Sequence, residues 1–156
     1  MSESAYIRHR EPTAEHGQTR DVSYPPMPEP LPVAVYDNHS HLEISDGDEP
    51  IDYAEQVRRA AEVGVVGVVQ VGGDVPTSEW SAETAATEPR MLAAVAIHPN
   101  EAPNYAAAGT LESAIARIDE LAAMPRTRAI GETGLDFFRT GPEGHAAQFA
   151  SFEAHI

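Results

Sequence analysis

Apolar runs alternate with amphipathic stretches from residue 33 to residue 156. Val65–Val71 is an apolar run of the kind that forms a strand covered on both faces. Between residues 111 and 121, apolar side chains recur at the spacing of one helix face. The pattern predicts strands at Val33–Tyr36, Val65–Val71, Met91–Ile97 and Arg128–Ile130. It predicts helices at Tyr53–Val63, from Thr77 or Ser78 to about Thr87, at Leu111–Met124 and at about Gly144–Ile156. This order indicates an α/β fold of four β/α units, with a parallel sheet and right-handed crossovers.

Local signals mark where these elements begin and end. Asp52, with Glu55 three residues later, resembles a capping box at the start of the first helix, and Gly64 ends that helix. Gly72-Gly73-Asp74 turns the chain out of the second strand. This glycine pair lacks the spacing and the Lys-Ser/Thr of a phosphate-binding loop, so we exclude that function.

Residues 1–32 have a different composition from residues 33–156. A polar segment leads into the proline-rich stretch Tyr24–Pro32, which cannot build a core and favours extended polyproline conformations. A flexible extension is expected here rather than a docking ligand for a partner, and His9 and His16 are expected to be idle. Residues 1–30 should therefore be dispensable for activity.

The composition limits the kinds of function that the chain can have. A formal charge of −15 and a pI near 4.6 argue against a broad basic surface for nucleic acid. All basic residues are arginines, and the chain has no cysteine, which excludes disulfides and thiolate ligands. No apolar stretch reaches the roughly 20 residues of a membrane span, and the first 20 residues lack a secretory apolar core. A cytoplasmic protein without a membrane partner is the expectation.

Two histidines follow the first predicted strand with one residue between them. Residues i and i+2 of a strand point to the same side, so His39 and His41 should face one site. Imidazole suits zinc and similar borderline metals. His-x-His also arises by chance, and the pair alone would not decide the matter.

Polar residues also follow each of the other predicted strands. Asp74 follows the second strand, His98 the third, and Glu132 and Asp136 the fourth. Parallel α/β folds place their chemistry at the carboxyl ends of strands, so we expect these residues to gather there. Taken singly, each has a simpler interpretation as a loop or turn residue.

Three motifs, in this order, resemble the TatD family of metal-dependent deoxyribonucleases. They are Asp37–Glu43, Ala94–Pro99 and Ala129–Arg139, and Gln148 and Phe149 also fit the family pattern. The resemblance covers roughly Val33 to Ile156. It implies a TIM-type (β/α)₈ barrel, a fold of typically ~250 residues. The chain would then hold about the first four β/α units, and we favour a truncated barrel over an open sheet or a pair of chains.

The resemblance also implies roles for individual residues. His39, His41 and Glu132 would bind metal, with Glu132 bridging toward a second ion. Two divalent ions are implied, Mg²⁺, Mn²⁺ or Zn²⁺, and the family takes its other ligands from later strands. His98 would lie near the scissile phosphate as a catalytic and substrate-binding residue, whereas Asn100 stands where relatives often have another histidine.

Three further residues have two interpretations each. Asp136 is a candidate for orienting a metal ligand or a water in the catalytic site, or else a turn aspartate. Arg139 is a candidate for binding a phosphate oxygen of the substrate, or else an exposed surface arginine. Asp37 is better interpreted as a structural partner of the histidine loop than as a ligand.

The activity that follows from the resemblance is hydrolysis of DNA phosphodiester bonds. The expected enzyme is a 3′–5′ exodeoxyribonuclease that acts on single-stranded 3′ ends in DNA repair or degradation. Bound cations would supply the positive field that this acidic chain lacks. Three alternatives stay open: a metal-dependent hydrolase of a small amide, ester or lactone; a non-catalytic binding chain; and a half that becomes active only with a complementing chain.

Overall fold

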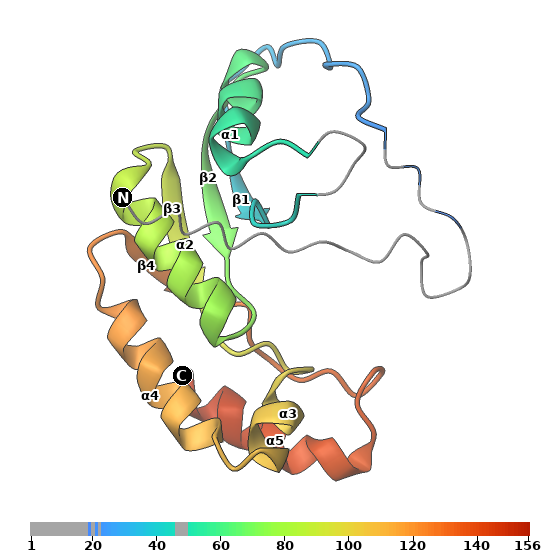
Figure 1. Cartoon of the computed structure of the whole chain (residues 1–156), viewed down its shortest axis with the longest axis vertical. Coiled ribbons are helices and arrows are strands. Elements are labelled where there is room, and N and C mark those ends of the chain that lie inside the picture. Colours follow the sequence, from blue (N-terminus) through green and yellow to red (C-terminus); the bar gives the residue numbers. More distant parts are fainter. Residues whose placement is uncertain (1–18, 20, 22, 46–49) are drawn as a thin grey trace.

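A single parallel sheet with the strand order β1-β2-β3-β4 organises the chain. The computed structural model describes residues 19, 21, 23–45 and 50–156. The strands are β1 (Val35–Ser40), β2 (Val65–Val71), β3 (Met91–Val95) and β4 (Thr127–Ile130). The helices are α1 (Tyr53–Glu62), α2 (Val75–Thr87), α3 (Ala102–Ala107), α4 (Leu111–Ala122) and α5 (Pro142–Ala154). All three strand pairs are parallel, so all carboxyl ends lie at one edge of the sheet (Figure 1).

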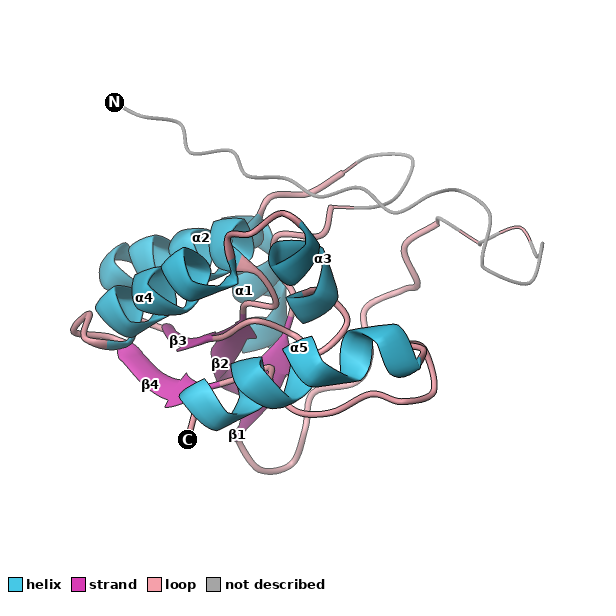
Figure 2. Ribbon diagram, turned by 90° about the horizontal axis from the view of Figure 1, so that it is seen from below, coloured by secondary structure: helices cyan, strands magenta, loops and turns pink. Residues whose placement is uncertain are grey.

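Three helices cover one face of the sheet, and two lie near its carboxyl edge. Figure 2 shows α1, α2 and α4 together above the strands, whereas α5 lies on another side. In Figure 1, α3 and α5 lie below the points of the strand arrows. Among the described residues, the face opposite α1, α2 and α4 has no such helical layer, and apolar side chains of both edge strands are exposed, including Tyr36 and Ile130. The predicted α/β architecture of four β/α units is confirmed.

The core consists of two apolar clusters between the sheet and these helices. One centres on Val95, Ile118 and Leu121 and joins β3 to α4. The other contains Trp80 and Met91, and the Trp80 ring meets the Tyr53 ring edge-on at 5.7 Å between centroids. These clusters fix the helices on the sheet and so determine where the loops at its carboxyl edge begin.

The elements differ from the prediction mainly at their ends. β1 begins at Val35 and continues to Ser40, so it includes residues expected in the loop, and β3 ends at Val95 rather than Ile97. α2 begins at Val75 because the Asp74 side chain accepts the Thr77 backbone N–H at 2.8 Å. The helix α3 was not predicted, since six residues that include Pro103 show no helical apolar pattern.

The proline-rich stretch lies along the surface next to α1. Leu31 donates its backbone N–H to Val63 O at 2.9 Å, and the Arg59 guanidinium lies 5.8 Å from the Tyr24 ring centroid. Residues 24–35 are exposed. His9 and His16 lie outside the described residues, and the boundary at residue 32 stays a prediction. Among the described helices, none combines the length and apolar character needed to cross a bilayer.

Candidate metal centre

Two histidines of β1 and its loop lie close to a glutamate that follows β4. β1 and β4 are the two edge strands of the sheet. The Nε2 atoms of His39 and His41 lie 3.2 Å apart. Glu132 Oε2 lies 3.5 Å from His39 Nε2 and 3.9 Å from His41 Nε2. One ligand atom from each residue lies within 4.8 Å of the others. The structure thus brings together the three residues predicted as metal ligands.

A bulge and an aspartate shape the segment that carries the histidines. Between Asp37 and Ser40, β1 has one more residue than the paired stretch Val68 to Gln70 of β2. Asp37 Oδ1 accepts the His39 backbone N–H at 2.9 Å, and Asp37 Oδ2 accepts the Ser40 hydroxyl at 2.8 Å. The structural role expected for Asp37 is confirmed by these two bonds.

The ends of β2 and β3 position Glu132. Its backbone N–H donates to Gly72 O at 3.0 Å, and the Gly131 N–H donates to Val95 O at 3.2 Å. Gly72 is needed because a Cβ there would lie 2.7 Å from Ser78 Cα at the start of α2. The main-chain bonding of the sheet therefore continues beyond the strands and places the carboxylate.

His98 lies on the other side of the same carboxylate. Its backbone N–H donates to Gly73 O at 2.7 Å, and its Nε2 lies 3.6 Å from Glu132 Oε1. His98 Nδ1 accepts the Asn100 backbone N–H at 3.1 Å, which in the neutral ring leaves the proton on Nε2, facing Glu132. The two oxygens of Glu132 therefore face different histidines.

Asp136 belongs to a hydrogen-bonded network that holds the loop after β4. Its carboxylate accepts the backbone N–H groups of Phe138 and Arg139, each at 3.0 Å, and the Asn100 amide at 3.1 Å. The backbone bond from Arg139 does most to lower the pKa of Asp136 below its ordinary value. Gln148, fully buried on α5, accepts the Asp136 N–H at 2.9 Å. These contacts favour the turn interpretation of Asp136, and Asn100 also has a structural bond here.

Two of the polar residues expected at the strand ends lie in other settings. Asp74 caps α2 in a capping box with Thr77, so its appearance after β2 reflects a helix start rather than the metal centre. Arg139 is exposed on the loop that Asp136 organises. Its predicted contact with a phosphate stays a prediction.

Two buried polar residues next to the centre were given no role by sequence reasoning. Glu43 closes the motif that carries the histidines, and its side chain is fully buried, with Oε1 3.6 Å from His41 Nδ1. Gln70 lies on β2 with no exposed surface and donates to Glu43 Oε2 at 2.6 Å. The signal was available, since Gln70 is the one polar side chain within the apolar run Val65–Val71.

The donor set fits a divalent metal ion. Two imidazoles and a carboxylate are ligands that zinc, manganese and iron accept, at roughly 2.0–2.2 Å for zinc. Donors 3.2–3.9 Å apart can share one ion at such distances. Glu132 Oε1 faces His98 rather than the histidine pair.

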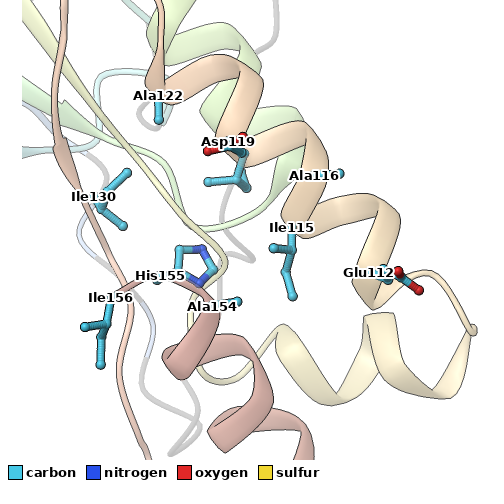
Figure 3. A pocket seen from close by; sticks show the side chains of 10 residues that line it. Glu112, Ile115, Ala116, Asp119, Ala122, Ile130, Ala154, His155 and Ile156 are labelled. Atoms are coloured by element: carbon cyan, nitrogen blue, oxygen red, sulfur yellow. The ribbon is translucent and has the colours of Figure 1, made fainter.

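A pocket of about 540 Å³ lies between α4, β4 and the end of α5 and shares no residue with the centre (Figure 3). Ile115, Ile130 and His155 are among the residues that line it. His155 Nε2 accepts the Ile97 backbone N–H at 3.2 Å, and its Nδ1 lies 2.6 Å from Ser151 O. Both nitrogens of His155 thus have structural partners, and the pocket offers no comparable set of ligands.

The arrangement of histidines and glutamate at the edge of a parallel sheet agrees with a family match. The family described as TatD related DNase matches residues 36–156. The chain belongs to this family. The TatD resemblance inferred from the motifs is therefore confirmed.

Curated TatD-family relatives are similar over part of their length. The chain is 35% identical over 107 residues to "Uncharacterized metal-dependent hydrolase TatD" of Mycobacterium tuberculosis, covering 69% of this chain and 39% of the relative. It is 34% identical over 105 residues to "3'-5' ssDNA/RNA exonuclease TatD" of Citrobacter rodentium, covering 67% and 38%. The chain thus spans about two fifths of the length of these TatD proteins.

A solved TatD-family structure shows the same fold. The crystal structure of YJJV, a TatD homologue from Escherichia coli, aligns with a TM-score of 0.57 at 20% identity, covering 77% of this chain and 44% of that one. The predicted fold class is confirmed: an α/β chain with about four β/α units of a TIM-type barrel.

Proposed function

We propose that this chain supplies the first half of a divalent-metal centre that hydrolyses phosphodiester bonds in single-stranded nucleic acid, from the 3′ end. The observation that carries the proposal is the convergence of His39, His41 and Glu132, with His98 on the second oxygen of Glu132. The family match supports a metal-dependent hydrolase, and several relatives, including the one from C. rodentium, are named ssDNA/RNA exonucleases.

Different residues of the chain would bind the metal and contact the substrate in such a centre. His39 and His41 would hold one ion with Glu132 Oε2, and Glu132 Oε1 would extend to a second. When bound, divalent ions would act as Lewis acids that activate water near neutral pH and neutralise phosphate charge. His98, with its proton on Nε2, would donate a hydrogen bond to a phosphate oxygen near Glu132.

The remaining predicted residues would act around this centre. Asp136 would hold the loop after β4 through its bonds to Asn100 and to the loop backbone. Arg139, on the same loop, would meet a backbone phosphate further along the strand. DNA is favoured over a small amide or ester because the named exonuclease relatives act on nucleic acid.

Metal binding by the chain itself is the first test. We expect Zn²⁺ or Mn²⁺ to bind the full chain with a measurable dissociation constant by calorimetry. His39→Ala combined with His41→Ala removes two of three donors and should weaken binding by about 100-fold or more, since affinity follows ligand number. His145→Ala, a histidine of α5 outside the centre, is the control and should bind as the unaltered chain does.

Activity is tested in a protein that carries this chain at the length of its relatives. We expect metal-dependent shortening of a 5′-labelled single-stranded oligonucleotide from its 3′ end, abolished by EDTA and by the double histidine substitution. Retained hydrolysis in the double variant would contradict the metal centre. Hydrolysis of nitrophenyl esters without cleavage of the oligonucleotide would instead favour the small-substrate alternative.

A further inference from the structure

We propose that Glu43 is a positioning residue that sets the tautomer and orientation of His41 through a relay that begins at a backbone N–H group. The relay runs from Leu42 N–H to Gln70, from Gln70 to Glu43, and from Glu43 to His41. This inference rests on the proposed function, because it explains how one ligand of that centre is prepared for metal.

The first link fixes the amide of Gln70. The Leu42 backbone N–H donates to Gln70 Oε1 at 2.6 Å. Since a backbone N–H can only donate, the carbonyl oxygen of Gln70 must face Leu42, and its NH₂ group must face the other way. That NH₂ group donates to Glu43 Oε2 at 2.6 Å.

The second link directs Glu43 at His41. With Oε2 bonded to Gln70, Oε1 of Glu43 lies 3.6 Å from His41 Nδ1, slightly longer than a hydrogen bond. A carboxylate favours a proton on the nitrogen that it faces. The proton of neutral His41 is therefore placed on Nδ1, and the lone pair is left on Nε2, which faces His39 and Glu132.

One oxygen of the buried carboxylate supports the loop, and the other faces His41. Glu43 Oε2 accepts from Gln70, whose own oxygen accepts the Leu42 N–H, whereas Glu43 Oε1 lies 3.6 Å from His41 Nδ1. Burying a carboxylate costs free energy unless hydrogen bonds or charges compensate it. The side chain of Glu43 has no exposed surface, and its contact with His41 gives a functional reason for that burial.

The test is the nearly isosteric change Glu43→Gln. Gln70 still needs an acceptor, so the new amide should turn its oxygen to Gln70 and its NH₂ group to His41 Nδ1. That arrangement favours the tautomer with the proton on Nε2, which cannot bind metal. We expect Zn²⁺ affinity, measured by calorimetry on the full chain, to fall by about 10–100-fold, the range typical for partners of metal-bound histidines.

The second readout needs no metal. At about pH 8, where imidazole is neutral, ¹⁵N NMR of the ring nitrogens should show His41 mainly protonated on Nδ1 in the unaltered chain and mainly on Nε2 in Glu43→Gln. Ser45→Ala is the matched control, because Ser45 is buried in the same loop and bonds to Ile51 O at 3.0 Å. It should change neither tautomer nor affinity, whatever it does to the melting temperature.

The outcomes separate the two proposals. An unchanged tautomer in Glu43→Gln, or an equal loss of affinity in Ser45→Ala, would overturn the positioning role. Failure of the unaltered chain to bind Zn²⁺ would contradict the proposed metal centre, while the metal-free NMR comparison would still decide whether Glu43 sets the tautomer of His41.

Discussion

Carboxylates near the candidate centre have different surroundings, and these decide what each can do. Glu132 is partly exposed and faces three imidazoles. Glu43 is buried behind His41, with one oxygen bonded to Gln70 and the other facing that ring. Asp136 is bonded to its own loop. Under the two proposals above, the same functional group would serve as ligand, positioning group and loop anchor.

The lowered pKa of Asp136 makes a prediction about stability and pH. A group whose pKa is lower in the folded state stabilises the protein above its unfolded value, near 3.8, and this contribution disappears as pH falls through the folded value. Asp136→Asn keeps an oxygen that accepts the N–H groups of the loop backbone. Its new NH₂ group, however, would face the NH₂ group of Asn100, and two donors cannot bond to each other. Urea unfolding should show a lower midpoint for the variant at pH 7 and a smaller difference near pH 3.

The control for Asp136→Asn is Asp119→Asn, an exposed carboxylate on α4. A midpoint difference for Asp136→Asn that is the same at both pH values would contradict the electrostatic origin of the effect.

At the scale of elements, the site depends on how strand ends and helix starts meet. β2 passes directly into α2, and Gly72 lies where a side chain would meet the first turn of that helix. The same residue holds the Glu132 backbone through its carbonyl. The packing of α2 on the sheet and the position of a metal ligand are therefore coupled through one glycine.

Gly72→Ala should disturb both properties. The added Cβ would lie 2.7 Å from Ser78 Cα, so α2 or the strand end must shift, and overpacking of this kind costs about 1–3 kcal/mol. We expect a lower free energy of unfolding in urea and weaker Zn²⁺ binding by calorimetry.

Gly73→Ala provides a control at the adjacent position, because a Cβ there would meet only His98 Cβ, at an ordinary 3.5 Å. It should cost less stability and less metal affinity than Gly72→Ala. Equal effects at the two positions would show that the contact with Ser78 is not what matters.

At the scale of the molecule, the described sheet has two open edges. β1 and β4 each pair with one neighbour, although the ligands that they carry converge across the sheet. His39 Nε2 and Glu132 Oε2 nevertheless lie 3.5 Å apart. The pocket beside β4 lies at the open edge next to Ile130.

The segment before β1 should matter little to the centre. Deleting residues 1–30 removes the contact between Tyr24 and Arg59 and the bond from the Ile51 backbone N–H to Tyr24 Oη at 3.4 Å, but keeps the bond from Leu31 to Val63. An exposed cation–π contact is worth about 0.5–1 kcal/mol and a hydrogen bond about 0.5–1.5 kcal/mol, so we expect a loss of stability of no more than about 2.5 kcal/mol and unchanged Zn²⁺ affinity. Collapse of the fold, seen as a loss of cooperative unfolding, would show that the segment is part of the domain.

The order of the strands and of four of the five described helices, and the convergence of His39, His41 and Glu132, could be predicted from the sequence. Apolar periodicity reports burial directly, and Val65–Val71 is a strand over the range predicted. The carboxyl ends of parallel strands share one edge, so placing His39, His41 and Glu132 at strand ends was enough to bring them together. These features depend on local chemistry and on the topology of parallel sheets.

The roles of the remaining polar residues depended on tertiary contacts. Asp74 and Asp136 also follow strands, but Asp74 accepts a backbone N–H at the start of α2 and Asp136 accepts backbone N–H groups of its own loop. Glu43 and Gln70 lie 27 positions apart in sequence, and only the pairing of β1 with β2 makes them neighbours. The sequence by itself thus determined the strands, most of the helices and which candidate metal ligands converge. The tertiary structure decided which carboxylates and amides hold those ligands, because hydrogen bonds between distant segments exist only once the sheet has formed.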